Sequence, residues 1–529
     1  MINWHNNAIF YELYLRAFND GNGDGHGDFT GLRQKLDYLQ WLGVDCIWLL
    51  PIFTSPLKDD GYDVASYYGV QPTYGVLEDF IITIEEIHRR GMKVIFDMVM
   101  NHTSDQHPWF QESRRSADSP LRDYYVWTTD TEKYKDARII FLDTERSNWA
   151  YSAPTSEYYW HRFYSSQPDL NYDNPEVRQK MMDAVKFWMD LGIDGFRLDA
   201  VPYLYEREGT NCENLPETHD FLKELRAFID ANYPGRILLA EANQWPNDLL
   251  PYFGKGDEMH ICFNFPVMPR LYMALAQQDR TPVIDVTAMT PEIPDNCQWA
   301  VFLRNHDELT LEMVTPEERQ FMWDFYAPDA RQRLNLGIRR RLAPLLDNDR
   351  AKIELMHSLL FTLPGTPVLY YGDEIGMGDD VSLPDRNGVR TPMQWADEVH
   401  AGFSSSQGQL YAQPIRDPLY GFQTVNVAAQ QADENSLLHA VRKMIAKRKE
   451  MPILSKGKLD FLLETPKETL CFSRSAGNER LFAFHNLSNE PRTVDFADWD
   501  ACVDAFDGSA PTSSSITLPP HGYRWLVKK

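Results

Sequence analysis

The fold is decided by the segment DGFRLDAV at residues 194–201, a short apolar run that carries Arg197 and Asp199 near its end. Patterns with helical spacing lie on either side of it, over residues 176–191 and 219–232. A short buried strand between two helices is typical of a βα unit in a parallel sheet. We therefore predict a strand here, with its polar end at the carboxyl edge of the sheet.

The same alternation extends in both directions along the chain, with helical spacing at residues 32–42 and 81–90. Eight strands are the number that a closed barrel needs, so the sequence predicts an α/β protein built on a (β/α)₈ TIM barrel. Besides the first segment, the predicted strands are AIFYELYL from residue 8, CIWLLPIF from 46, KVIFDMVMNH from 93, RILLAEA from 236, MHICFNF from 259, WAVFLRNH from 299 and TPVLYYG from 366.

Two stretches depart from this alternation. Residues 102–173 are rich in Tyr, Trp, Ser and Asp without clear periodicity, which predicts a module inserted after the third strand. Short alternating segments over residues 456–529 predict a C-terminal antiparallel β-sandwich. The barrel would then comprise residues 1–101 and 174–455, with a peripheral subdomain near 378–435. The basic stretch 330–350 is interpreted as a helix with a solvated cationic face rather than a nucleic-acid patch.

Bulk composition limits the classes of function. The chain has 529 residues and a formal charge of −25, which argues against nucleic-acid binding because phosphate contacts need clustered Lys and Arg. No apolar run of about 18 residues is present, so we expect no membrane span. The N-terminal residues lack the pattern of a signal peptide, and the six cysteines have no CxxC spacing. We expect a cytoplasmic protein with buried free thiols; whether copies associate as a homo-oligomer stays open.

Polar clusters occur at four predicted strand ends, where enzymes on this barrel place catalytic groups. One such residue alone would more often be a helix cap. Four clusters converging on one rim are costly to bury unless they act together. The clusters are Asp97 with Asn101 and His102, Arg197 with Asp199, Glu241, and His306 with Asp307.

These segments resemble the α-amylase clan of glycoside hydrolases and transglycosidases over essentially the whole chain. The matching segments are DMVMNH at 97, GFRLDA at 195, AEANQWP at 240 and RNHDE at 304, with GYD at 61, QPDLN at 167 and GTPVLYYGDEIGM at 365. The resemblance implies a retaining mechanism with Asp199 as nucleophile, Glu241 as acid/base and Asp307 as transition-state stabiliser. In retaining enzymes the two reacting carboxyl groups are about 5–5.5 Å apart.

Within the clan, residues 195–219, 238–246 and 302–315 are most similar to the trehalose synthases. This resemblance implies intramolecular transglucosylation that interconverts maltose and trehalose, with minor hydrolysis and no organic cofactor. An α-glucosidase and a non-catalytic partner or transporter subunit remain the alternatives. Expected substrate-binding roles are closure of the glucose pocket by an Asp63–Arg390 pair, ring stacking by Tyr62, and hydrogen bonds from His102 and His306. Arg197 is expected to keep Asp199 ionised, because a nearby cation lowers the pKa of a carboxyl group. The mobile glucose would be retained by Asn243, Glu308 and Arg386.

Two sites for a structural divalent ion, Ca²⁺ or Mg²⁺, are also expected. Oxygen-bearing residues at every second position of a glycine-rich loop suit a hard cation, although Gly31 stands where an EF-hand has its bidentate glutamate. These ligands would be Asp20, Asn22, Asp24, His26 through its carbonyl, and Asp28. Relatives bind calcium between barrel and insert, which by resemblance implicates Asn101, Asp169, Tyr203, Leu204 and Glu206; for Tyr203 and Leu204 a place in the barrel interior is an equal alternative.

Overall fold

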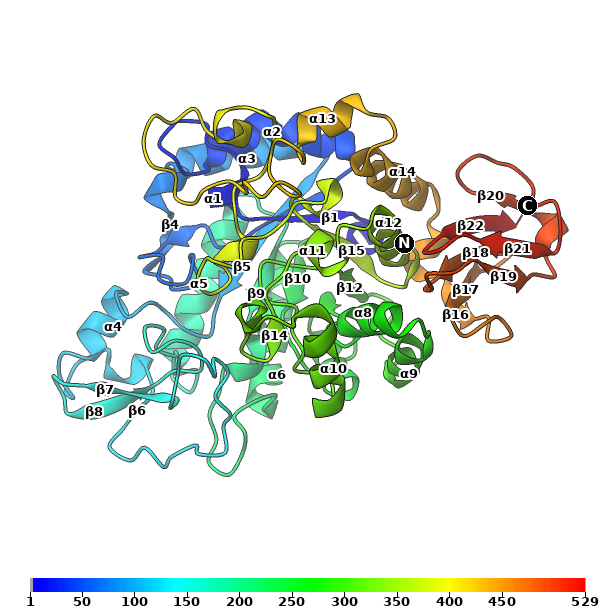
Figure 1. Ribbon diagram of the computed structural model, residues 1–529. Coiled ribbons are helices and arrows are strands. Elements are labelled where there is room, and N and C mark those ends of the chain that lie inside the picture. The colour runs from blue at the N-terminus through cyan, green and yellow to red at the C-terminus, as the bar shows by residue number, and fades with distance from the viewer. Residues whose placement is uncertain (1–2, 529) are drawn as a thin grey trace.

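A closed barrel of eight parallel strands forms the centre of the protein, seen in the computed structural model that describes residues 3–528 (Figure 1). Seven strands lie within segments predicted from the sequence, and β12 begins one residue before its predicted segment, which confirms the barrel. In order around the barrel the strands are β1 (Phe10–Leu13), β15 (Thr366–Tyr370), β12 (Gln298–Phe302), β11 (Ile261–Phe263), β10 (Ile237–Ala240), β9 (Gly195–Asp199), β5 (Lys93–Val99) and β2 (Cys46–Leu49).

Alternation along β9 decides which side chains face the barrel axis. Phe196 points outward and packs edge-to-face on Phe96 of the neighbouring strand, with 5.2 Å between the ring centroids. Arg197 and Asp199 therefore point to the other face, because side chains two residues apart share a face. The register places Arg197 opposite Asp97 of β5. The charged side chains inside the barrel thus lie near the carboxyl ends of the strands.

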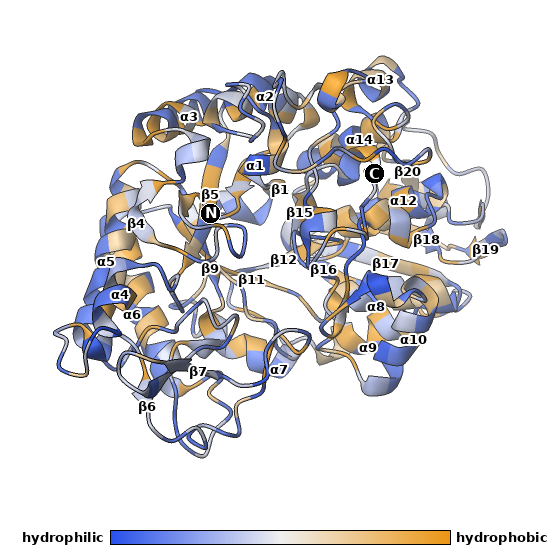
Figure 2. Cartoon of the chain, turned by 60° about the vertical axis from the view of Figure 1, so that its left-hand side comes forward, coloured by the Kyte–Doolittle hydropathy of each residue, from blue (hydrophilic) through white to orange (hydrophobic). Residues whose placement is uncertain are grey.

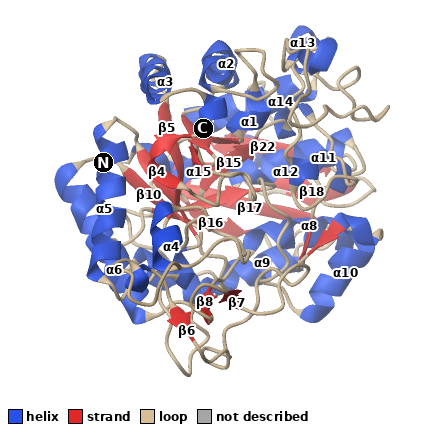
Figure 3. Cartoon of the chain, turned by 90° about the vertical axis from the view of Figure 1, so that its left-hand side faces the viewer, coloured by secondary structure: helices blue, strands red, loops and turns tan. Residues whose placement is uncertain are grey.

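Helices surround the strands and cover their outer face (Figure 3). In Figure 2 the same helices carry both hydrophilic and hydrophobic residues, as amphipathic helices on a barrel should. Asp28 begins α2 by accepting the backbone N–H of Gly31, and Gly43 ends it with a φ of 102°. The longer barrel helices are α2 (Phe29–Leu42), α3 (Leu77–Arg89), α5 (Pro175–Asp190), α6 (Pro216–Asn232), α8 (Val267–Gln277), α9 (Thr281–Met289), α10 (Pro316–Tyr326), α12 (Arg350–Thr362) and α14 (Leu437–Glu450).

Shorter elements fill the connections between the barrel units. The strand pair β3 (Phe53–Thr54) and β4 (Ser66–Val70) lies between β2 and α3. The short helices are α1 (Leu15–Phe18), α7 (Pro246–Leu249), α11 (Leu342–Leu345), α13 (Val427–Ala432) and α15 (Ile453–Lys456).

The insert after β5 is a small module beside the barrel mouth, at the lower left of Figure 1. It contains α4 (Pro108–Ser113) and a sheet in which β8 (Glu157–Trp160) pairs with both β6 (Trp127–Thr128) and β7 (Trp149–Ser152). A β-bridge between His102 and Asp169 joins the chain where it leaves the barrel and returns to it. The insert is thereby anchored next to the carboxyl end of β5.

The C-terminal segment folds into antiparallel sheets, as predicted. Five strands pair in the order β16 (Lys458–Phe461), β17 (Thr469–Ala476), β18 (Glu479–Asn486), β22 (Tyr523–Lys528) and β20 (Cys502–Asp504), and β19 (Arg492–Asp495) pairs with β21 (Ser515–Leu518). A separate hydrophobic cluster that includes Phe484, Val494 and Ile516 joins the two sheets. This is the packing of a β-sandwich.

The helix predicted over residues 330–350 is wrong. This stretch forms the hairpin β13 (Arg333–Leu334) and β14 (Gly337–Ile338), followed by the short helix α11. Two of its arginines are held by distant partners: Arg340 contacts Asp379 at 3.0 Å, and Arg341 is fully buried and donates to the Tyr371 carbonyl. Local spacing could not reveal these long-range acceptors.

Two further observations concern the whole described chain. Across residues 3–528, no helix is both long and apolar enough to span a membrane. All six cysteines are buried and free, in agreement with the expected thiols.

Candidate active site

Arg197 lies at the centre of the charged residues in the barrel mouth. Its Nη1 is 2.9 Å from Asp97 Oδ1 and 2.6 Å from Asp199 Oδ1, and its Nη2 is 2.9 Å from Glu241 Oε2. One guanidinium thus bridges the last residue of β9 and the first residue after β10. The two carboxyl groups predicted to react are therefore held side by side, as a retaining mechanism requires.

A strained backbone supports this arrangement. Ala200, directly after Asp199, adopts the left-handed conformation with φ 51° and ψ 35°, which is costly for a residue with a Cβ atom. In this conformation its N–H donates to Glu241 Oε2 at 3.2 Å. The turn therefore links the two reacting carboxyl groups through backbone as well as through Arg197.

Burial raises the pKa of both carboxyl groups of the pair, and that of Glu241 to the higher value. It raises the pKa of Asp199 to about 6, against the lowering effect of Arg197. It raises the pKa of Glu241 to about 8, again against Arg197, with Asp199 adding to the rise. Near pH 7 Asp199 is ionised and Glu241 is protonated, which are the states of a nucleophile and a general acid.

The pH dependence of kcat/KM follows from these values. Below about pH 6 Asp199 takes up a proton and cannot attack, and above about pH 8 Glu241 loses the proton that it must donate. We expect a bell-shaped profile with its maximum near neutrality. Initial rates on a neutral glucoside from pH 4 to pH 10 test this, because the substrate does not titrate there. A profile with no alkaline limb would contradict the role of Glu241.

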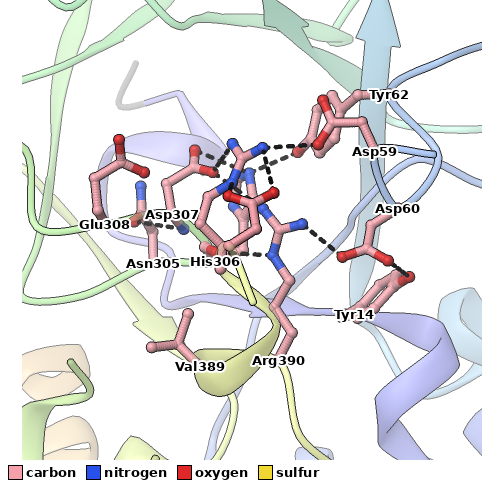
Figure 4. Close-up of polar contacts among 12 residues, drawn as sticks. Tyr14, Asp59, Asp60, Tyr62, Asn305, His306, Asp307, Glu308, Val389 and Arg390 are labelled. Atoms are coloured by element: carbon pink, nitrogen blue, oxygen red, sulfur yellow. Dashed lines mark hydrogen bonds and ion pairs between the residues drawn. The ribbon is translucent and has the colours of Figure 1, made fainter. Parts of the chain in front are cut away.

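Asp307 is held by two arginines, of which Figure 4 labels Arg390. Its Oδ1 lies 2.9 Å from Arg386 Nη1 and 3.1 Å from Arg390 Nη2. Burial alone would raise the pKa of Asp307, but His306 and the two arginines outweigh it and hold the pKa well below its usual range. Asp307 therefore stays ionised beside the reacting pair, as stabilisation of a cationic transition state requires.

The expected Asp63–Arg390 pair is wrong. Arg390 instead contacts Asp60 Oδ2 at 2.8 Å, as Figure 4 shows, and donates to the His306 carbonyl. Asp63 accepts the hydroxyl of Ser55 and the backbone N–H groups of residues 58 and 59, so it shapes its own loop. Asp59, two residues before Gly61, pairs with Arg386 at 2.7 Å and lines the cavity that Asp63 was expected to close.

Tyr62, His102 and His306 line the cavity, as expected, but the Tyr62 ring stacks on a protein side chain. The Tyr62 ring stacks on His306, with 5.5 Å between centroids and an interplanar angle of 10°, and its hydroxyl lies 3.0 Å from Asp97 Oδ2. One face of Tyr62 is thus covered by protein, and stacking on a sugar stays a prediction. His102 Nε2 is buried and lacks a hydrogen-bond partner within the described structure, so it is available to a ligand.

A cavity opens above these residues. Arg197, Arg390 and Asp63 are not among the residues that line it. Of the predicted catalytic and substrate-binding residues, the lining contains Tyr62, His102, Asp199, Glu241, Asn243, His306, Asp307, Glu308 and Arg386. Tyr203, which was predicted as a metal ligand, also lines the cavity.

The insert and the hairpin β13–β14 form a roof over the cavity. Phe141 and Phe163 of the insert line it, and Asp143 accepts the backbone N–H of Asn335 at 2.8 Å. Arg138 of the insert reaches Glu312 of the barrel at 2.8 Å. Sequence reasoning missed these residues, since they belong to segments without periodicity. The aromatic richness of the insert was the available signal.

The two expected metal sites differ in how well their residues fit an ion. In the glycine-rich loop, Asp20 accepts the N–H of Gly23 at 2.6 Å and the Ser404 hydroxyl at 2.5 Å, while Asp28 caps α2. Within residues 3–528 no group of three or more His, Cys, Asp or Glu side chains is arranged around a common point. The loop carboxylates thus have protein donors.

The site between barrel and insert fits a cation better. Three buried oxygens have no hydrogen-bond partner in the described part of the chain: Asn101 Oδ1, Asp169 Oδ2 and Glu206 Oε1. A hard divalent ion prefers such oxygen ligands. The Tyr203 side chain lies elsewhere, since its hydroxyl accepts from Arg138 at 3.2 Å, so Tyr203 and Leu204 could contribute only carbonyl oxygens.

Comparisons with known proteins agree with this geometry. The trehalose synthase/amylase TreS of Mycobacterium tuberculosis is 53% identical over 540 residues, which cover 99% of this chain and 90% of that protein. The trehalose synthase of Thermus thermophilus is 50% identical over 542 residues, covering 99% of this chain and 56% of that protein.

Solved structures of sugar-converting enzymes are also similar. An inactive double mutant of MutB in complex with isomaltulose superposes with a TM-score of 0.82 at 27% identity, over all of both chains. The trehalulose synthase MutB from Pseudomonas mesoacidophila gives 0.80 at 27% identity, again over all of both chains. The model of the α-amylase catalytic domain matches residues 12–322 and 339–457. The chain therefore belongs to the α-amylase family.

Proposed function

We propose that the protein is a glucosyl-transferring isomerase that interconverts maltose and trehalose by double displacement. The observation that carries this proposal is the Arg197-bridged pair of Asp199 and Glu241 at the base of a roofed cavity. The relatives named trehalose synthase, about 50% identical over nearly the whole chain, support the choice of reaction.

In the first step the Asp199 carboxylate attacks the anomeric carbon of the non-reducing glucose. The bond from this carbon to the bridging oxygen breaks, and Glu241 gives its proton to that oxygen. A covalent glucosyl ester and free glucose result. Asp307, held ionised by Arg386 and Arg390, stabilises the positive charge that develops on the sugar.

In the second step the freed glucose turns and attacks the ester through its anomeric hydroxyl. Glu241, now a carboxylate, takes the proton of that hydroxyl, and Asp199 leaves. Two polar side chains suit retention of this glucose. Asn243 Oδ1 is buried without a hydrogen-bond partner among the described residues, and Glu308 reaches over the cavity to Asn335 at 3.2 Å.

Water competes with glucose for the ester, so enclosure decides the product. The roof contacts Asp143–Asn335 and Arg138–Glu312 join the insert to the barrel across the cavity. A glucose held in such an enclosure acts at a high effective concentration, which for well-oriented partners reaches about 10⁵ M or more. The enclosure therefore favours isomerisation over hydrolysis.

Product analysis tests the proposal against its runner-up, an α-glucosidase with the same catalytic residues. Incubation of the purified protein with maltose alone should give trehalose as the main product and glucose as a minor one. Trehalose alone should give maltose. Glucose as the main product from both sugars would make hydrolysis the function.

We further propose a structural divalent ion between barrel and insert, held by Asn101, Asp169 and Glu206, and a second in the loop of residues 20–28. Ion binding to the native state stabilises it, so a chelator should lower the melting temperature by a few degrees. Glu206→Gln should remove the response of the first site, and Asp24→Ala that of the second. A melting temperature that chelator leaves unchanged in the unmodified protein would contradict both sites.

A further inference from the structure

Glu12 is an acidic residue inside β1, a strand whose four residues are all buried. Its side chain has no exposed surface, and neither the mechanism above nor the sequence motifs assign it a role. Burying a carboxyl group costs free energy unless its partners compensate. A carboxyl group buried in the barrel interior is therefore a candidate for a functional role.

Both hydrogen bonds of the Glu12 carboxyl group are made with a single residue. Its Oε1 lies 3.1 Å from the backbone nitrogen of His306 and 2.5 Å from the ring Nδ1 of the same residue. Its Oε2 has no hydrogen-bond partner among residues 3–528. The Glu12 carboxyl group thus engages the backbone and the ring of His306 together.

This contact decides which nitrogen of His306 faces the cavity. Because Oε1 accepts the backbone N–H, it also acts as the acceptor toward the ring, and the ring proton lies on Nδ1. The opposite nitrogen, Nε2, lies 2.7 Å from the Tyr62 hydroxyl and 3.2 Å from Asp307 Oδ2. Nε2 is therefore the nitrogen that His306 turns toward the substrate side of the ring.

We propose that Glu12 is a positioning residue that holds a proton on Nδ1 of His306 and fixes the orientation of its ring for contact with the reacting sugar. The inference rests on the proposed glucosyl transfer, which gives His306 a sugar to contact. Partners that orient a metal-ligating histidine through its far nitrogen typically contribute about 10- to 100-fold, and we expect an effect of similar size for His306. Glu12 would act in this way from beneath the cavity.

A second buried glutamate, Glu374, provides a matched control for Glu12. Tyr11 points to the opposite face of β1, and its hydroxyl donates to Glu374 at 2.7 Å. Glu374 is also fully buried and also accepts from Tyr38, but it is not among the residues that line the cavity. It matches Glu12 in burial and residue type without contacting His306.

A double-mutant cycle tests the inference, with kcat and KM measured as maltose consumption. Glu12→Ala should lower kcat by about 10- to 100-fold with a smaller change in KM. Glu12→Gln, whose amide oxygen can accept the same two N–H groups, should recover most of the loss. In a His306→Ala background Glu12→Ala should cause no further loss, because the two residues act as a unit.

A merely structural role gives a different pattern. Glu374→Gln should lower the melting temperature, and any loss of kcat that it causes should multiply with the loss from His306→Ala. If the losses from Glu12→Ala and His306→Ala multiply in the same way, or if Glu12→Gln behaves like Glu12→Ala, the inference is overturned. The proposed reaction is judged separately, from the products of the unmodified protein.

Discussion

Asp199→Ala should reduce the turnover of maltose by on the order of 10⁵-fold, as loss of a covalent nucleophile does in other enzymes. In the proposed mechanism Asp199 forms the bond to the anomeric carbon. Neither Asp97 nor Asp307 is placed to replace it, because Asp97 is paired with Arg197 and Asp307 is held by Arg386 and Arg390. The fold should persist, because the barrel strands remain intact. Initial rates and circular dichroism measure the two effects.

Covalent labelling identifies the nucleophile directly. A fluorinated glucosyl donor that forms the ester but resists its breakdown should label Asp199, as peptide mapping by mass spectrometry would show. Asp183→Ala is the control, since Asp183 is exposed on α5, accepts a hydrogen bond from Gln179 and does not line the cavity; the variant should label and turn over normally. Label on Glu241 or Asp307 would refute the assignment of Asp199.

Glu241→Gln should slow maltose turnover by about 10²–10⁴-fold, the usual contribution of a general acid–base catalyst. The amide keeps the shape of the side chain but cannot donate a proton to the bridging oxygen. α-Glucosyl fluoride has a leaving group that needs little protonation, so the first step should survive. One equivalent of fluoride should be released per enzyme, followed by a stalled ester, because the second step lacks its base.

The two variants together separate the two roles. Asp199→Ala should release no burst of fluoride, whereas Glu241→Gln should release one equivalent. If Glu241→Gln turned over maltose at a normal rate, another residue would be the acid. The pKa of about 8 at Glu241 would then reflect burial without catalytic use.

Most of the fold and the reacting pair were predictable from the sequence. The eight barrel strands are short apolar runs, whose burial depends on local composition. Because the carboxyl ends of parallel strands meet at one rim, Asp199 and Glu241 had to lie near each other once the barrel was assigned. Family resemblance then gave their roles. Their contact through Arg197 is in agreement with both arguments.

Partners on loops were not predictable in the same way. Leu57, Asp60 and Gly61 all have positive φ, so the chain reverses direction within a few residues, and Asp60 rather than Asp63 reaches Arg390. Simple alternation does not apply to such a turn. Glu12 was missed for another reason: it stands inside an apolar strand, and its partner His306 is 294 residues away. An acidic residue in a predicted interior strand was the signal.

Isotope exchange tests the central claim most directly, which is that the glucose released from maltose stays in the enclosed cavity and is used again. The protein is incubated with unlabelled maltose and an excess of ¹³C-glucose, and the trehalose formed is analysed by mass spectrometry. The account predicts trehalose that is almost free of label, while total maltose falls at its normal rate. Trehalose labelled in proportion to the free glucose would contradict it, because the acceptor would then come from solution.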